Sequence, residues 1–179
     1  MKHLVTLITG FLFMNFVIAQ KTLIPTDQGS KMHFVIKNFG IKTGGDLSGL
    51  NGTIKFDQGN IALWSFDVTV KANTIDTDND TRDGHLRKSE YFDAVKYPDI
   101  YMISSKITAT EKPGIYLFIG NLTIKGVTKP VQFPFKVNKA NDGFIFSGDF
   151  NINRRDFGVG GSSVSLSDNL KVSLSIFAK

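Results

Sequence analysis

The sequence has no cysteine, one tryptophan, three histidines and five prolines among its 179 residues. The absence of cysteine excludes disulfide bonds and thiolate metal sites, so the fold must be stable through packing alone. Two of the histidines, His33 and His85, lie beyond the N-terminal region. A zinc site takes three or four His, Cys or carboxylate ligands, and this sequence therefore predicts no metal centre.

The chain also lacks a block of charge of one sign. It carries 21 basic and 16 acidic residues, and the lysines are scattered along its length. Nucleic-acid-binding proteins usually combine a basic stripe with aromatic residues on one face, which is not visible here. We therefore expect no nucleic-acid partner. No long apolar run follows the N-terminal region, so no integral membrane segment is expected in the mature chain.

The N-terminal region combines Lys2, an apolar stretch over residues 4–18 and the small residue Ala19. A charged start, a short apolar run and a small residue at the cleavage point are typical of a secretory signal peptide. We predict a signal peptide over residues 1–19 and a single mature domain over residues 20–179. The protein is accordingly expected to be periplasmic or secreted.

Alternation of apolar and polar residues is the main pattern of the mature chain. Such a period of two places one set of side chains on one face of a β-strand. Turn signals such as Gly44-Gly45 and Asn141-Asp142-Gly143 separate the alternating stretches. The pattern predicts an all-β fold, an eight-stranded antiparallel sandwich or barrel. The eight predicted strands lie within residues 32–36, 50–56, 62–70, 100–102, 116–124, 131–137, 144–152 and 170–178.

The predicted inward faces are rich in phenylalanine and include Gly52, Gly120 and Gly148. A glycine inside a strand marks either a bend or a place where room is needed. The three glycines are therefore compatible with a lumen kept open for one slender ligand. They are equally compatible with bent strands around a core that phenylalanine fills. The binary pattern alone does not distinguish these two interiors.

Residues 75–100 are rich in aspartate. Asp76, Asp78 and Asp80 match the start of a calcium-binding loop, but such a loop needs glycine at position six and glutamate at position twelve. Thr81 and Arg87 stand there, so the calcium hypothesis fails. The same stretch predicts one short helix over residues 84–92, lying across one end of the barrel.

Asp83 is expected to cap that helix, because its side chain can accept a hydrogen bond from a free backbone amide. Pro98 disfavours helical geometry at the preceding residue, so the chain is expected to be extended again by that point.

No catalytic constellation is recognisable. Ser162 and Ser163 follow two glycines but do not lie in the strand-turn-helix elbow of a nucleophilic serine. The neighbouring residues 158–161 lack the Gly-Lys-Ser/Thr ending of a phosphate-binding loop. We therefore predict that the protein is not an enzyme and has no cofactor.

Several stretches resemble the signature of the YceI-like family. The segments RDGHL at residues 82–86 and FDAVKYP at residues 92–98 carry the resemblance most specifically. Residues 30–40, 120–131 and 153–161 agree as well, so the similarity covers essentially the whole mature chain. Asn38 departs from the pattern where many members carry histidine, and Met102 stands where an aromatic residue is common.

The resemblance implies an extended, lipocalin-like antiparallel barrel of about eight strands. It also implies a binding protein, exported from the cytoplasm, that holds a polyisoprenoid, an isoprenoid quinone or a similar long-chain lipid with its tail in the lumen. On this basis the open lumen is favoured over the filled core. The expected lumen residues are Phe34, Ile36, Phe56, Trp64, Phe66, Phe118, Gly120, Leu122, Phe133, Phe135, Phe146, Gly148 and Phe150.

Five residues are candidates for the mouth of the barrel: Arg82, Asp83, His85, Arg87 and Arg155. In one interpretation, the first three form a structural motif that fixes the short helix over the barrel. In the other, His85 and the three arginines contact a polar or phosphate headgroup, to which arginine donates paired hydrogen bonds.

Two alternative functions remain open at the level of the sequence. The first is an enzyme acting on an amphiphilic substrate, with His85 and Asp83 as an acid/base pair. The second is a secreted stress or interaction protein whose interior is a filled core. The sequence predicts neither the identity of the headgroup nor the oligomeric state.

Overall fold

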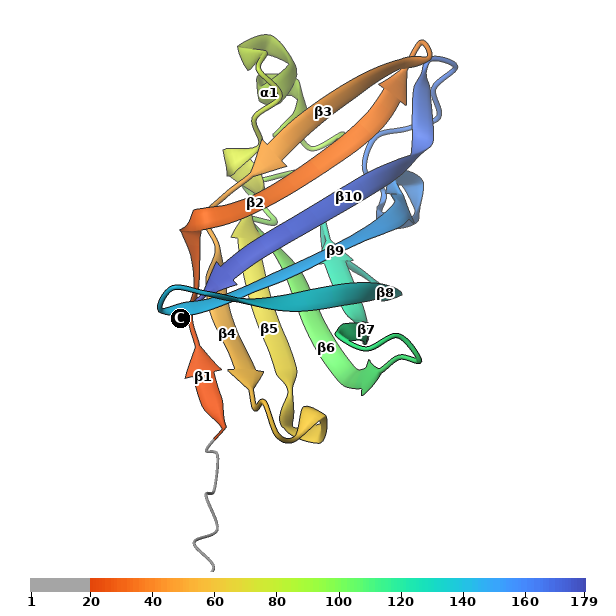
Figure 1. Cartoon of the computed structure of the whole chain (residues 1–179). Coiled ribbons are helices and arrows are strands. Elements are labelled where there is room, and N and C mark those ends of the chain that lie inside the picture. The colour runs from red at the N-terminus through yellow and green to blue at the C-terminus, as the bar shows by residue number, and fades with distance from the viewer. Residues whose placement is uncertain (1–19) are drawn as a thin grey trace, which may run out of the picture.

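The computed structural model describes residues 20–179, which form an all-β fold with one short α-helix (Figure 1). Its strands make a single antiparallel sheet, curled into a half-barrel, in the order β1-β4-β5-β6-β7-β8-β9-β10-β2-β3. The strands of the described residues are β1 (Lys21–Leu23), β2 (Pro25–Asn38), β3 (Ile41–Leu47), β4 (Asn51–Phe56), β5 (Ser65–Lys71), β6 (Asp99–Ala109), β7 (Ile115–Ile124), β8 (Val127–Ala140), β9 (Gly143–Asn153) and β10 (Leu166–Ala178).

The curl of the sheet follows from the connection between its first two strands, β1 and β2. Only Ile24 separates β1 from β2, yet β1 pairs with β4 and β2 pairs with β10. The backbones of Ile24 and Lys179 exchange two hydrogen bonds of 2.7 and 3.1 Å at this junction. The β1–β2 segment thus connects the two halves of the sheet and brings the inward faces of β4 and β10 toward one interior.

The outer edge of β3 is held at one further point. Asp46 on β3 and Asp76 exchange backbone hydrogen bonds of 2.7 and 3.1 Å. Asp76 follows β5 and the short 3-10 helix η2 (Ala72–Thr74), so this bridge joins the β3 edge to the segment that leads into the α-helix. The segment is therefore anchored beside the interior.

Each of the eight predicted strands overlaps a strand of the sheet, but the predicted count of eight is wrong because residues 20–179 form ten strands. The additional strands are β1, which is only three residues long, and β3. Gly44 and Gly45 lie inside β3 and do not form the predicted turn. The turn lies instead at Phe39 and Gly40, whose φ angles are 49° and 78°.

The two glycines of β3 are explained by their neighbours on β2. A Cβ atom on Gly45 would lie 2.6 Å from Cζ of Phe34, and one on Gly44 would lie 2.8 Å from the ring of His33. The missing side chains therefore make room for two rings on the paired strand. A second boundary also differs from the prediction: residues 61–63 form the 3-10 helix η1 (Ile61–Leu63) before β5 begins.

The α-helix, α1 (Asp80–Leu86), begins earlier than predicted. Asn79 caps it, because its side chain accepts a hydrogen bond of 2.9 Å from the amide of Arg82. The predicted helix over residues 84–92 capped by Asp83 is therefore wrong in its bounds and in its cap, since Asp83 lies inside the helix and is buried. As predicted, the helix lies over one end of the curled sheet (Figure 1).

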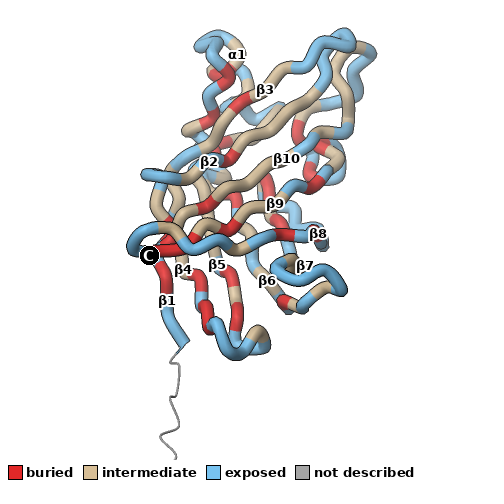
Figure 2. The backbone as a smooth tube through the Cα atoms, in the orientation of Figure 1, coloured by how far each residue is buried: buried red, intermediate tan, exposed pale blue. Residues whose placement is uncertain are grey.

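The inner face of the sheet carries the core, and Figure 2 shows buried and exposed positions following one another along single strands. In β8, for example, Phe133 and Phe135 are buried whereas Gln132, Pro134 and Lys136 are not. The predicted alternation is thus confirmed in this strand.

The predicted signal peptide lies outside the described residues. Within residues 20–179, no helix has the length and apolar character needed to cross a membrane.

Candidate functional site

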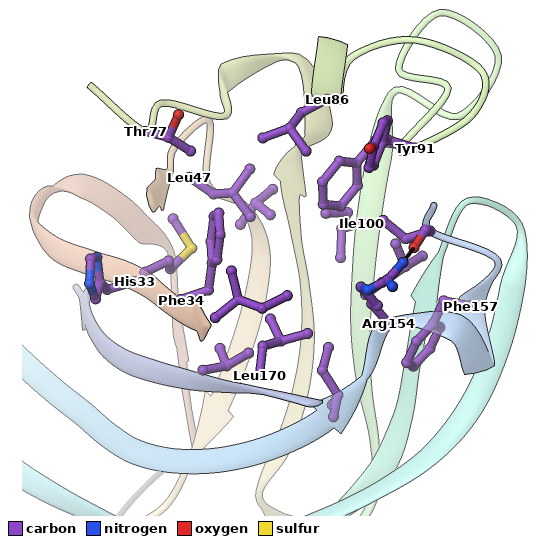
Figure 3. A pocket seen from close by; sticks show the side chains of 18 of the residues that line it. His33, Phe34, Leu47, Thr77, Leu86, Tyr91, Ile100, Arg154, Phe157 and Leu170 are labelled. Carbon is purple, nitrogen blue, oxygen red and sulfur yellow. Dashed lines mark hydrogen bonds between the residues drawn. The ribbon is translucent and has the colours of Figure 1, made fainter. Parts of the chain in front are cut away.

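The upper half of the interior contains a cavity of about 670 Å³, shown in Figure 3. Its walls are inward-facing side chains of strands from both halves of the sheet. Most of them are aliphatic, and several belong to stretches in which alternate residues face inward. The strand residues of this apolar wall include Met32, Phe34, Ile36, Leu47, Val68, Val70, Ile100, Met102, Leu122, Ile124, Phe150, Ile152, Leu170, Val172, Leu174 and Ile176.

The lower half of the interior is filled by aromatic rings. Phe118 and Phe133 stack with their centroids 4.9 Å apart, and Phe133 and Phe150 stack at 4.6 Å. Phe66 makes edge-on contacts with Phe118 and with further rings at 5.3 to 5.9 Å. Such pairs fill space and are favourable in themselves. This ring cluster, called the aromatic floor below, packs beneath the cavity and reaches the cavity lining at Phe150.

The floor is completed around the single tryptophan. Trp64 lies 4.5 Å from Phe56 and 4.6 Å from Tyr116, measured between ring centroids. Its indole N–H donates to the backbone carbonyl of Asp57, so the polar end of the ring is satisfied although the residue is buried. Among the described residues, no buried side-chain nitrogen or oxygen lacks a hydrogen-bond partner.

The thirteen residues expected in a lumen are divided between these two parts. Four of them, Phe34, Ile36, Leu122 and Phe150, lie in the cavity wall. The other nine lie outside the lining, among or beside the packed rings. These nine are Phe56, Trp64, Phe66, Phe118, Gly120, Phe133, Phe135, Phe146 and Gly148.

The strand glycines that suggested an open lumen have a different role. A Cβ atom on Gly120 would collide with the carbonyl oxygen of Ile103 on β6, and one on Gly148 would lie 2.8 Å from the carbonyl oxygen of Pro134. Gly52 combines a similar backbone contact with a φ of 116°. All three glycines therefore permit a close approach of neighbouring strands, and the cavity lies elsewhere.

Asp83 holds the segment before α1 in place at one end of the cavity. Its carboxylate accepts hydrogen bonds from the amide of Thr77, at 3.1 Å, and from the Thr77 hydroxyl, at 2.5 Å. Arg82 donates from Nε to the same hydroxyl at 2.7 Å and from a terminal nitrogen to the Thr77 carbonyl at 2.5 Å. Asp83 and Arg82 thus fix Thr77 through hydrogen bonds, and Thr77 is part of the cavity lining.

Arg87 makes a similar structural contact outside the cavity lining. It donates to the carbonyl oxygens of Asn73 and Ile75, each at 2.8 Å. His85, in contrast, lines the cavity, and within residues 20–179 its ring has no hydrogen-bond partner. The acid/base hypothesis required a His85–Asp83 pair, whereas the Asp83 carboxylate is bonded to Thr77.

Arg155, predicted at the mouth, lies outside the cavity lining. Its side chain is half exposed and approaches Asp168 at 3.5 Å. Its neighbour Arg154 lies in the lining and is nearly buried, with 5% of the side chain exposed. Arg154 was not selected in the sequence analysis. The signal was present, because Phe150 and Ile152 of β9 face inward and residue 154 is the next position in this series of alternate residues.

The Arg154 guanidinium is held by three partners. It donates to the carbonyl oxygens of Ser167 at 3.0 Å and Val159 at 2.9 Å, and to the Asp168 carboxylate at 2.8 Å. A guanidinium has five N–H donors, so two remain for other acceptors. Arg154 therefore brings fixed positive charge and free donors to the edge of an apolar cavity (Figure 3).

The remaining histidine lies at the border of the site. His33 bonds through Nδ1 to Asp46 at 2.6 Å across the β2–β3 pair, with a third of its side chain exposed. No group of three or more His, Asp or Glu side chains within residues 20–179 is arranged to hold a metal ion.

Comparison with known proteins places this architecture in a family. The model of the YceI-like domain matches residues 25–178. A UPF0312 protein from Yersinia enterocolitica is 31% identical over 152 residues, which span 80% of this chain and 77% of that protein. The protein YceI from Salmonella arizonae is 34% identical over 128 residues, which span 70% of this chain and 65% of that protein.

Solved structures agree with the sequence comparison. BcnA from Burkholderia cenocepacia has a TM-score of 0.79 at 26% identity, covering 85% of this chain and 98% of its own. A polyisoprenoid-binding domain from Saccharophagus degradans has a TM-score of 0.67 at 14% identity, covering 90% of this chain and 99% of its own. At this low identity, the similarity is one of fold. The family match spans almost the whole of the described sheet, and the chain belongs to the YceI-like domain family.

Proposed function

We propose that the protein binds the apolar chain of a polyisoprenoid, an isoprenoid quinone or a similar long-chain lipid in the upper cavity and carries it outside the cytoplasm. The observation that carries this proposal is the cavity of about 670 Å³ with a predominantly apolar wall. Small-molecule sites in proteins typically measure about 300 to 1,000 Å³. The likeness to a polyisoprenoid-binding domain from Saccharophagus degradans supports the class of ligand.

The aromatic floor limits the length of chain that can be enclosed. At roughly 30 Å³ per non-hydrogen atom, the cavity accommodates on the order of twenty atoms. Burial contributes about 0.8 kcal/mol per CH₂, so twenty carbons contribute roughly 16 kcal/mol before the cost of ordering the chain. We therefore propose that a tail of about twenty carbons fills the cavity and that the remainder of any longer tail stays outside.

The polar residues of the lining are proposed to contact the headgroup. His85 and Arg154 offer hydrogen-bond donors beside the apolar wall. Arg82 lines the cavity as well, although two of its donors are directed to Thr77. Since the wall is nonspecific, these few groups would determine which headgroup is accepted. Arg87 is proposed to hold the segment before α1 through the carbonyl oxygens of Asn73 and Ile75, and Arg155, outside the lining, is given no contact with the ligand.

The location outside the cytoplasm rests on the signal peptide predicted over residues 1–19 and on family membership. Binding without a catalytic step is also part of the proposal. Its support is that the one acid/base pair suggested by the sequence, His85 with Asp83, is replaced by the Asp83–Thr77 hydrogen bonds.

The proposal is tested by filling the cavity from two walls. Met102 and Val172 line it on β6 and β10, so the double variant Met102→Trp/Val172→Trp should reduce binding of geranylgeraniol by at least tenfold. The matched control is Tyr101→Trp/Lys171→Trp, which alters the outward-facing neighbours on the same strands. Fluorescence or calorimetric titration measures both. Unchanged binding in the first variant would refute the cavity as the site.

A further inference from the structure

The turn between β2 and β3 places a phenylalanine where the backbone disfavours it. Phe39 and Gly40 both have positive φ angles, 49° and 78°. Hairpin turns of this kind favour Asn-Gly, and a bulky side chain at positive φ is an outlier. Packing does not compensate for it, because Phe39 is 78% exposed and Ile41, which follows the turn, is 71% exposed. Neither the backbone conformation of the turn nor side-chain packing therefore explains why Phe39 and Ile41 stand at these positions.

A second loop brings another apolar side chain to the same end of the molecule. The amide of Phe39 donates to the carbonyl of Ser165 at 2.8 Å, and Asn38 pairs with Leu166. The neighbouring Val164 is fully exposed. Figures 1 and 2 show the β2–β3 turn and the loop before β10 side by side at the upper end, both exposed. We call Phe39, Ile41 and Val164 the apolar tip.

Two lysines lie immediately behind the apolar tip. Lys37 on β2 and Lys42 on β3 are directly opposite one another and both are exposed. Like charges in this position destabilise a hairpin. Of the ion pairs within residues 20–179, none involves either lysine. Residues 35–44 and 157–167 contain no Asp or Glu, so the two loops of the tip supply no carboxylate to these lysines.

The apolar tip adjoins residues that line the cavity. Asn38 adjoins Phe39 in the sequence, and Ser163 and Ser165 adjoin Val164; all three line the cavity, as does the nearby Leu166. A surface in contact with the tip would therefore also lie close to this part of the cavity wall.

We propose that the apolar tip docks this protein on an anionic phospholipid bilayer. Phe39, Ile41 and Val164 enter the interface between headgroups and acyl chains, while Lys37 and Lys42 contact the lipid phosphates. Two exposed loop tips form a convex surface, which suits insertion into a bilayer, and the paired lysines complement its negative charge. Docking places the cavity mouth against the membrane, where a lipid can enter or leave. That last role rests on the proposed function, whereas docking itself does not.

The first test is flotation of the purified protein with vesicles. Phe39→Asn and the double variant Lys37→Ser/Lys42→Ser should each lower binding to mixed phosphatidylglycerol–phosphatidylcholine vesicles by about tenfold or more. For the double variant, this loss corresponds to about 1 kcal/mol per lysine. Asn suits the positive φ, so Phe39→Asn should melt no lower than the parent protein. Loss of binding is then separated from loss of folding.

The matched controls lie away from the tip. Leu63 in η1 is exposed, and Lys55 and Lys136 are exposed lysines of β4 and β8. Leu63→Asn and Lys55→Ser/Lys136→Ser should leave vesicle binding unchanged. Equal losses in the tip and control variants, or equal binding of the parent protein to phosphatidylcholine alone, would overturn the proposal.

The second test locates the insertion directly. The native Trp64 is buried, so a Phe39→Trp variant adds one exposed reporter at the tip. Brominated lipids in anionic vesicles should quench this added fluorescence, whereas a Leu63→Trp variant should show no added quenching. Equal quenching of the two reporters would overturn the assignment of the docking surface.

A transfer assay separates docking from lipid binding. Phe39→Asn should take up the same final amount of geranylgeraniol as the parent protein but should take it from vesicles about tenfold more slowly. Vesicle binding without any uptake by the parent protein would refute the proposed function and leave the docking proposal standing. Uptake from anionic vesicles at the parent rate in Phe39→Asn would overturn the role of the tip in exchange.

Discussion

Arg154 and Arg155 are neighbours in the sequence with opposite environments. Arg154 is nearly buried and donates to three acceptors, whereas Arg155 is half exposed and has one ion pair at 3.5 Å. Removing a buried charged donor leaves its acceptors unsatisfied, which costs several kcal/mol. An exposed ion pair contributes little.

Arg154→Met should therefore lower the free energy of unfolding by about 2 to 4 kcal/mol, and Arg155→Met by less than about 1 kcal/mol. Urea denaturation of the two variants measures the difference. Similar losses for both would contradict the view that the three hydrogen bonds of Arg154 stabilise the fold more than the exposed ion pair of Arg155. The sequence offered the signal for this distinction, since the alternation of β9 puts residue 154 on the inner face.

Alanine substitutions at two glycines are expected to change the stability of the protein in opposite directions. Gly120→Ala introduces a Cβ against the backbone carbonyl of Ile103, so its stability should fall by about 1 to 3 kcal/mol. Gly84 lies in α1, and a Cβ at this position would meet no atom of another element within 4 Å. Gly84→Ala should therefore raise stability by up to about 1 kcal/mol. Thermal melts of both variants check the signs. A stabilised Gly120→Ala would show that this glycine does not mark a close strand approach.

At the scale of elements, α1 is fixed by polar contacts at its start. Asp83 satisfies the amide and hydroxyl of Thr77, and Asn79 caps the helix. Asp83→Ala would leave the buried Thr77 amide without its acceptor, at a cost of about 1 to 3 kcal/mol. Asp80→Ala, in the exposed first turn of the same helix, is the matched control and should cost less than about 1 kcal/mol.

The effect of Asp83→Ala should be localised. Hydrogen exchange is expected to become faster over residues 75–87 and to stay unchanged in β7, β8 and β9. Uniform faster exchange across the sheet would contradict the view that Asp83 acts on this segment. The control should show the parent pattern throughout.

The elements also show where sequence reasoning succeeded. Eight alternating stretches became strands because each buries one face against the interior. The strand β3 was missed because Gly44 and Gly45 read as a turn, although they make room for His33 and Phe34 on the paired strand. The helix was placed too late because Asn79, and not Asp83, supplies the cap.

At the scale of the whole molecule, the interior is divided into a packed aromatic floor and an apolar cavity. The alternation of apolar and polar residues identified the inward faces of the strands. It could not show which inward residues fill the core and which line the cavity, because both interiors require the same binary pattern. The division depends on ring packing, such as the stack of Phe118, Phe133 and Phe150, which is set by three strands together. Four of the thirteen expected lumen residues therefore line the cavity.

The central claim is that the cavity holds the tail of a long-chain lipid. Its most direct test is organic extraction of the protein, purified after expression with residues 1–19 present, followed by mass spectrometry of the extract. The claim predicts a stoichiometric isoprenoid or similar lipid that is depleted in Met102→Trp/Val172→Trp and retained in Tyr101→Trp/Lys171→Trp. An extract free of lipid, even after incubation of the protein with membrane lipids, would contradict it.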